Sequence, residues 1–138
     1  MSLTARLMQR LRPLTLGERG ERWAARQLRR QGCTIVAARH RQRYGEIDII
    51  AVEGRTVVFV EVKTRRSDRG IHPVDAVDAR RRGRLTRAAA AFLKAHDLLS
   101  YPARFDVVEV VWPAGARRPL MRRHRGAFAA EGTGQFFR

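Results

Sequence analysis

Two apolar segments, at residues 45–52 and 55–64, constrain the fold of this chain more than any other feature. Both are rich in Ile, Val, Thr and Phe, which favour β-strands. Glu53 and Gly54 separate them, and an acidic residue followed by glycine is typical of a tight hairpin turn. The sequence therefore predicts an antiparallel hairpin with a two-residue turn at Glu53 and Gly54.

Charged residues interrupt these apolar segments, although such residues are disfavoured in strands and rarely buried. They are Asp48, Glu61 and Lys63. Because side chains alternate along a strand, Glu61 and Lys63 share one face. The predicted turn places Asp48 opposite Phe59 and diagonal to Glu61, on that same face. A shift of one residue would move Asp48 to the other face, so the register is part of the prediction.

Two interpretations of this charged group are open. A surface ion pair between Glu61 and Lys63 would contribute up to about 1 kcal/mol. A divalent-metal site would use the carboxylates as hard oxygen ligands, which suit Mg²⁺ or Mn²⁺. The chain has 29 Lys and Arg residues, and Lys63 and Lys94 are its two lysines. Since a compact ammonium fits beside a water and a phosphate where a guanidinium does not, we favour the metal site.

Length and composition restrict the class of protein. The 138 residues predict one domain. A net charge of +16 indicates an anionic partner such as nucleic acid, in preference to an acidic membrane surface. The single cysteine, Cys33, excludes an internal disulfide and a multi-cysteine zinc site. No apolar run approaches 18 residues, and we expect a soluble cytoplasmic protein with no membrane partner.

The first fifteen residues are basic and are interpreted as an N-terminal extension. Leu3, Leu7 and Leu11 have the spacing of an amphipathic helix, but a frayed basic terminus is the interpretation that we favour. A helix is predicted at residues 17–31, with Gly32 as its C-terminal cap.

That helix carries two glutamates near its start. Glu21, Ala24, Ala25 and Leu28 lie on one helical face, so Glu21 begins the buried stripe. Glu18 has a simpler explanation, because an acidic residue in the first turn is stabilised by the helix dipole.

The remaining elements follow from periodicity and composition. They are a strand at 33–39, a basic connector at 40–44, a polar loop at 65–72, an element opened by Pro73, a helix at 78–96, a strand at 103–112, and a short last strand with a loose tail within 120–138.

Arginines beside the predicted site are candidates for binding nucleic acid. Arg81 lies four residues before Leu85 and so shares the inward face of its helix, where it can point toward the site. Arg84 lies on the outer, basic surface of the same helix. Arg65 and Arg66 follow directly after the charged strand.

The chain resembles the YraN family of small bacterial proteins, within the PD-(D/E)-x-K nuclease superfamily, and is similar to archaeal Holliday-junction resolvases. The resemblance covers residues 16–128. It depends on five motifs: GE at 20–21, GEIDIIA at 45–51, FVEVKTR at 59–65, RFDVV at 104–108 and AF at 127–128.

This resemblance implies a single-domain α/β fold with a restriction-endonuclease-like core, in which helices flank a central mixed β-sheet at residues 16–128. Residues 129–138 would form a C-terminal tail. The resemblance also implies catalytic roles for Glu21, Asp48, Glu61 and Lys63.

The expected cofactor is Mg²⁺ or Mn²⁺. Its ligands would be the carboxylates of Asp48 and Glu61, with the backbone carbonyl of Val62 as a third, and Glu21 would hold a second ion or a water. Two positions depart from the family pattern: His40 stands where Asn is usual, and Arg81 where Lys is usual. Arg81 keeps the charge but not its geometry.

We therefore expect a metal-dependent endonuclease that hydrolyses DNA phosphodiester bonds, in branched recombination or repair intermediates, with branched or single-stranded DNA as its partner. The resemblance suggests a homodimer. The alternative is a non-catalytic DNA-binding or recombination-accessory module with the same fold. An RNA- or ribosome-associated protein is less favoured, because it would have no use for the acidic pair.

Overall fold

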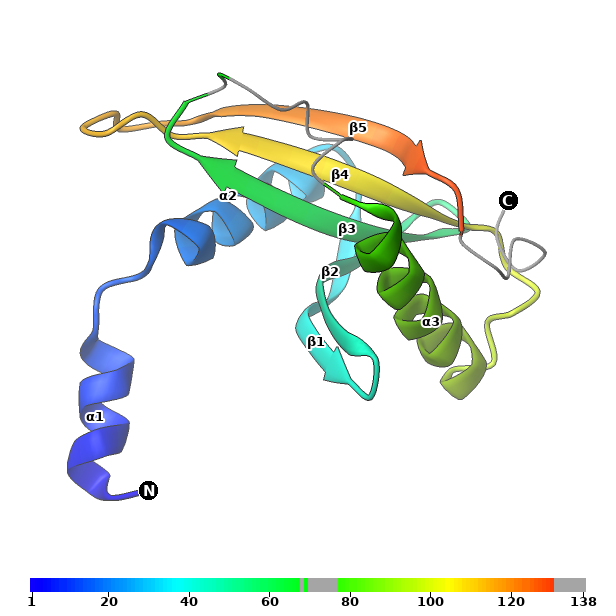
Figure 1. Cartoon of the computed structure of the whole chain (residues 1–138), viewed down its shortest axis with the longest axis horizontal. Coiled ribbons are helices and arrows are strands. Elements are labelled where there is room, and N and C mark those ends of the chain that lie inside the picture. The colour runs from blue at the N-terminus through cyan, green and yellow to red at the C-terminus, as the bar shows by residue number, and fades with distance from the viewer. Residues whose placement is uncertain (68, 70–76, 131–138) are drawn as a thin grey trace.

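A mixed five-stranded sheet, in the order β1-β2-β3-β4-β5, forms the centre of the structure (Figure 1). The computed structural model describes residues 1–67, 69 and 77–130. Neighbouring strands are antiparallel except for β3 and β4, which are parallel. The strands are β1 (Thr34–Gln42), β2 (Gly45–Glu53), β3 (Thr56–Arg65), β4 (Ala103–Val111) and β5 (Leu120–Phe128).

Two helices cover opposite faces of this sheet, and a third precedes them. They are α1 (Leu3–Leu11), α2 (Leu16–Arg30) and α3 (Ala79–Ala95). Parallel strands need a crossover connection, and α3 lies in the one that joins β3 to β4. The side chains of α2 and α3 belong to two separate apolar clusters, one on each face. The protein is thus a single α/β domain, as predicted. Within the described residues, no helix is long and apolar enough to cross a membrane.

The start of α2 is fixed by a capping box. The Thr15 hydroxyl accepts a hydrogen bond from the backbone N–H of Glu18, and the Glu18 carboxylate accepts one from the backbone N–H of Thr15. The guanidinium of Arg12, which hydrogen-bonds Glu18, holds the pKa of that carboxyl at about 2. The predicted first-turn role of Glu18 is therefore confirmed.

The hairpin forms, but its predicted register is wrong by two residues. Glu53 pairs with Thr56, so the turn residues are Gly54 and Arg55 instead of Glu53 and Gly54. Gly54 takes a positive φ of 62°, which glycine adopts at little cost. Because the side-chain period of a strand is two, a register shift of two residues does not by itself move any side chain to the other face. With the observed register, Asp48 lies level with Glu61 instead of level with Phe59.

Two other elements differ from the prediction. The first strand continues to Gln42, so residues 40–42 extend β1 instead of forming a connector. The N-terminus is helical, not frayed: the hydroxyl of Ser2 caps α1 by accepting the N–H of Ala5, and no residue of α1 is buried. Parts of the predicted 65–72 loop, together with Pro73 and residues 131–138 of the predicted tail, lie outside the described residues.

Close packing of α2 on β3 depends on Gly20. A Cβ added there would overlap Thr64 Oγ1 and would lie 2.7 Å from its Cγ2 and 2.8 Å from its Cβ. Rotation of Thr64 about χ1 cannot move its own Cβ, so the helix or the strand would have to shift. The glycine thus brings α2 against the strand that carries Glu61, and the next residue, Glu21, lines a cavity together with Asp48.

Gly20→Ala should therefore destabilise the protein by about 1–3 kcal/mol, the usual cost of overpacking. Gly17→Ala is the matched control, because Gly17 lies in the same helix and an added Cβ would meet nothing nearer than Thr15 Oγ1 at 4.0 Å. It should stabilise the helix by up to about 1 kcal/mol. Urea unfolding of both variants measures the difference, and equal stabilities would contradict the packing argument.

Candidate active site

The candidate site lies where β2 and β3 separate. Their last backbone pair is Ile49 with Val60, and beyond it β2 turns away with β1 while β3 continues beside β4 (Figure 1). At this fork the Asp48 carboxylate replaces the missing backbone partner, because its Oδ2 accepts a hydrogen bond of 2.8 Å from the N–H of Val62. Asp48 is thereby fixed to the strand that carries Glu61.

An irregularity in β1 and β2 aims Asp48 into the fork. Arg39, which the register places opposite Asp48, has a positive φ of 52°, a conformation that is uncommon outside glycine. Ile47 and Ile50 pack in the same apolar cluster, although strict alternation would place them on opposite faces. The strand is therefore distorted between them, and Asp48 lies at the sheet opening instead of squarely on one face.

Glu61 is the buried acidic centre of the site. Its side chain is 4% exposed. Arg81 Nη2 donates to both carboxylate oxygens, at 3.2 and 3.1 Å, and Lys63 Nζ lies 3.4 Å from Oε1. The prediction that Arg81 points inward toward the site therefore agrees with the structure. Lys63 and Arg81 together offset the charge of Glu61.

The ionisation of Asp48 reflects this environment. Burial, followed by the negative charge of Glu61, raises the pKa of Asp48 to about 7. The hydrogen bond from Val62 and the charge of Arg81 oppose the shift. A carboxylate binds a metal ion only when it is deprotonated, so a cation and a proton compete for Asp48 near neutral pH.

Glu21 approaches the fork from the face that α2 covers. Its carboxylate accepts a hydrogen bond of 2.9 Å from Arg39 Nε, and its side chain is about one-fifth exposed. Glu21 and Asp48 both line a cavity of about 440 Å³ between α2 and the β1–β2 hairpin. Glu61 and Lys63 lie on the opposite face with Phe59. Asp48 is thus the residue at which the two faces meet.

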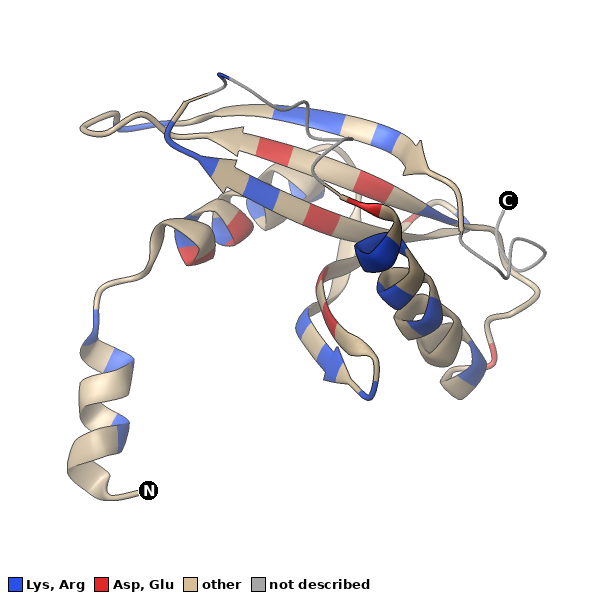
Figure 2. Cartoon of the chain, in the orientation of Figure 1, with Lys and Arg blue, Asp and Glu red and all other residues tan. Residues whose placement is uncertain are grey.

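The arginines predicted to bind nucleic acid lie in different surroundings. Arg81 is committed to Glu61, while Arg84 is exposed on α3. Arg66 Nη1 donates to the carbonyl of Trp112 at 3.3 Å, and the Arg65 carbonyl accepts the N–H of the same tryptophan. Figure 2 shows basic residues along α2, α3 and β5 as well, so the positive surface is broader than these four positions.

Glu109 is a buried carboxylate that the sequence analysis did not assign to the site. It pairs in register with Lys63, on the same face of the sheet, and is 3% exposed. Its Oε2 lies 3.9 Å from His124 Nε2, and in the described part of the chain neither atom has a hydrogen-bond partner. The sequence contains a sign of this residue, since Glu109 interrupts an apolar strand just as Glu61 does. Sequence alone could not show which strand lies beside Lys63.

His40 has a packing role in this structure. Its ring contacts Phe92 edge-on, with centroids 5.3 Å apart, and so joins the β1–β2 hairpin to α3. Phe92 contacts Phe59 in the same manner at 5.9 Å. The departure from Asn at this position therefore adds an aromatic contact beneath the site.

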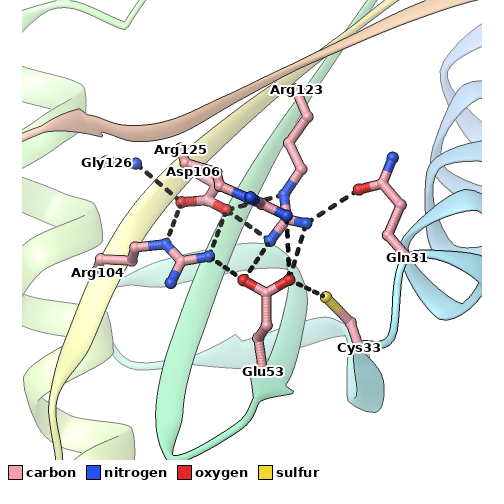
Figure 3. A network of polar contacts seen from close by, with 8 residues as sticks. All are labelled: Gln31, Cys33, Glu53, Arg104, Asp106, Arg123, Arg125 and Gly126. Atoms are coloured by element: carbon pink, nitrogen blue, oxygen red, sulfur yellow. Dashed lines mark hydrogen bonds and ion pairs between the residues drawn. The ribbon is translucent and has the colours of Figure 1, made fainter.

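A second polar cluster, here called the Glu53 network, joins β2, β4, β5 and the end of α2 (Figure 3). Its carboxylates are Glu53 and Asp106. Arg104 and Arg123 bridge them, with contacts between 2.6 and 3.4 Å. Arg104, followed by Arg123, lowers the pKa of Glu53 to about 2. The network is internally paired, which indicates a structural role.

The acidic residues of the site fit one small divalent ion better than a closed cage of protein ligands. Among the residues that the structure describes, no three His, Cys, Asp or Glu side chains are placed to hold one ion together. Asp48 and Glu61 interact closely enough for one charge to shift the pKa of the other. Mg²⁺ commonly uses one or two carboxylates and keeps several waters. The pair of Asp48 and Glu61 satisfies that requirement.

The fold and site define a class: a small α/β protein with a restriction-endonuclease-like core and an acidic pair with a lysine at the fork of its sheet. The family model described as "Uncharacterised protein family UPF0102" matches residues 20–110. This chain belongs to the UPF0102 family, the YraN-like group that its motifs resemble.

Relatives with the same family name align over most of the chain. A UPF0102 protein of Rhodopirellula baltica is 46% identical over 125 residues, which is 88% of this chain and 75% of the relative. One from Syntrophus aciditrophicus is 44% identical over 118 residues, 85% of this chain and 91% of the relative. One from Symbiobacterium thermophilum is 48% identical over 95 residues, 69% and 80% of the two chains.

Proposed function

We propose that this protein is a metal-dependent endonuclease that hydrolyses phosphodiester bonds of DNA, in branched recombination or repair intermediates. The observation that carries the proposal is the meeting of Asp48, Glu61 and Lys63 at the fork between β2 and β3. Asp48 is tied to the backbone beside Glu61 by the 2.8 Å bond from Val62, and Lys63 lies 3.4 Å from Glu61.

Each side chain has a distinct part in this reaction. Asp48 and Glu61 would hold Mg²⁺ or Mn²⁺ through their carboxylates, with the Val62 carbonyl as a further oxygen. Such an ion supplies polarisation of a phosphoryl oxygen and a more acidic water. Lys63 orients the attacking water or offsets negative charge as it develops on the phosphate, because positioning and electrostatics dominate phosphoryl transfer.

Glu21 and Arg81 support the site from opposite faces. Arg81 donates to Glu61 at 3.1 Å, and the same guanidinium would also bind a phosphate oxygen of the substrate. Glu21 would hold a water or a second ion from the α2 side. The net charge of +16 supplies affinity for DNA without reading its sequence. We place this activity in the cytoplasm, where a bacterial chromosome is accessible.

One observation favours a second candidate, a DNA-binding or recombination-accessory module without catalysis. Arg81 and Lys63 already balance Glu61, so the fold does not need a metal ion to tolerate that buried carboxylate. The basic surface would serve this function equally well.

A cleavage assay on branched, single-stranded and linear DNA, with and without Mg²⁺ or Mn²⁺, separates the two. We expect cleavage that requires the ion and falls about 100-fold or more in Lys63→Ala, the loss typical of removing one charge-stabilising group. Lys94→Ala is the matched control, since Lys94 is the other lysine and is exposed on α3. Its activity should equal that of the wild type.

Two outcomes would contradict the nuclease proposal. One is binding of DNA without cleavage under every ionic condition, which favours the accessory module. The other is cleavage that survives unchanged in both Lys63→Ala and Asp48→Ala, which identifies a contaminating nuclease.

A further inference from the structure

The cavity beside Asp48 continues along α2 as a basic groove. We define the α2 groove as the 440 Å³ cavity between α2 and the β1–β2 hairpin, lined by Glu18, Glu21, Arg22, Ala25, Arg26, Arg29, Ala38, Arg39, Asp48 and Ile49. Strand β2 contributes Asp48 and Ile49 to the lining, and one side of α2 forms the wall of the groove. The groove therefore opens directly onto the carboxylate at the fork.

Its charges fall into two groups. At the end near Asp48, Arg39 is paired with Glu21, at 2.9 Å, and lies 3.8 Å from Glu18. Farther along α2, within the described part of the chain, neither Arg22 nor Arg29 has a carboxylate partner. The groove thus has an internally neutralised end at the candidate site and an uncompensated positive wall leading away from it.

The arginines of the positive wall form a row along α2. Arg22, Arg26 and Arg29 follow one side of α2 at helical spacing, and all three are exposed. Seven residues of helix rise about 10.5 Å, so the three guanidiniums are spread along a length that can contact successive phosphates of one strand. Arg26 lies over the ring of Trp23, with 5.6 Å to its centroid, so it is partly held in place on the helix surface.

The size of the groove selects its ligand. A volume of 440 Å³ is in the range of small-ligand pockets, so the groove can take one strand of a backbone but cannot enclose a duplex. Among the described residues, none that lines the groove is aromatic, so its arginines are suited to phosphates and not to bases.

We propose that the α2 groove binds the phosphate backbone of a single DNA strand next to the bond that is cleaved. The substrate then has to carry a single-stranded segment, such as a flap, an overhang or an opened junction arm, and a continuous duplex is a poor substrate. This inference depends on the proposed function for the position of the cleaved bond, but the groove itself can be tested by binding alone.

The test uses the full chain with Asp48→Asn, so that no DNA is cut, and the triple change Arg22→Gln, Arg26→Gln and Arg29→Gln in that background. Fluorescence anisotropy measures affinity for a flap DNA and for a blunt duplex of equal length. At 0.15 M salt we expect about 50-fold weaker flap binding and a salt slope smaller by about 2, from about 0.7 per lost contact on a single strand. Duplex binding should change several-fold less.

A matched triple change removes the same charge elsewhere. Arg30, Arg117 and Arg118 are exposed and do not line the groove, and their replacement by Gln should affect flap and duplex binding equally and weakly. Thermal unfolding confirms that both triple variants are folded. Equal losses in the two triples would overturn the proposal, as would an equal loss of flap and duplex binding in the groove triple.

Two further results separate this inference from the proposed function. An RNA flap of the same sequence that binds more tightly than DNA, through the same three arginines, would overturn DNA as the ligand. Wild-type protein that binds flap DNA through the groove but never cleaves it would contradict the nuclease proposal and still support the proposed role of the groove.

Discussion

Asp48→Asn should abolish cleavage and at the same time stabilise the protein above neutral pH. Cleavage is expected to fall about 10³-fold, the upper range for loss of one charged group from an active site, because the amide cannot act as an anionic metal ligand. The amide oxygen can still accept the N–H of Val62, so the fork should keep its shape.

The stability effect follows from the raised pKa of Asp48. The pKa is about 7 in the folded protein against 3.8 normally, so the folded state binds the proton more tightly than the unfolded chain. The stabilisation due to protonated Asp48 is complete below about pH 4 and is lost as the pH rises to about 7. Above that, ionised Asp48 costs the wild type up to about 4 kcal/mol, at 1.36 kcal/mol per unit. Asn avoids this cost.

Urea unfolding of the two proteins in EDTA, at pH 4 and pH 8, measures the effect. The difference in free energy of unfolding should be near zero at pH 4 and should favour Asn at pH 8, while titrating groups that do not interact with Asp48 cancel in the comparison. Added Mg²⁺ at pH 8 should stabilise the wild type and leave Asp48→Asn unchanged. If the difference in free energy of unfolding does not vary with pH, the pKa of Asp48 is not raised in the folded protein.

Local patterns were sufficient to predict much of this architecture. Alternation assigned Glu61 and Lys63 to one face of β3, and helical periodicity placed Leu85 on the inward face of α3, where it is buried. The position of Arg81 followed from the same period and agrees with its contact to Glu61. These predictions succeed because the spacing of side chains within one element is fixed by its backbone geometry.

What sequence could not provide was the relation between elements and the exceptions to ideal geometry. The hairpin register depended on whether the turn began at Glu53 or Gly54, which alternation does not decide. The positive φ of Arg39 has no sequence signal, yet it helps turn Asp48 into the fork. Glu109 and Lys63 are 46 positions apart, and only the parallel pairing of β3 with β4 makes them neighbours.

The contacts of the Glu53 network also join separate elements and could not be predicted from the sequence. Mutation of this network is expected to cause the largest loss of stability. Asp106 is fully buried and accepts hydrogen bonds from Arg104, from Arg123 and from the backbone N–H of Gly126. Gly126 has a positive φ of 59° and lies where the β4–β5 register shifts, so the carboxylate satisfies a backbone group that the ladder leaves unpaired. Asp106 thus joins the largely buried guanidinium of Arg123 and the half-buried one of Arg104 to an irregular strand.

Asp106→Ala should destabilise the protein by about 3–5 kcal/mol, because one partner is removed from a buried ion cluster and the remaining charges stay buried. Thermal unfolding should show a fall in Tm of on the order of 10 °C or more. The control is Glu46→Ala, which removes a carboxylate from an exposed pair with Arg41 and should cost at most about 1 kcal/mol. Asp106 faces away from Glu61, so the folded fraction should retain its DNA cleavage. Equal losses in the two variants would mean that the network contributes no more than a surface ion pair.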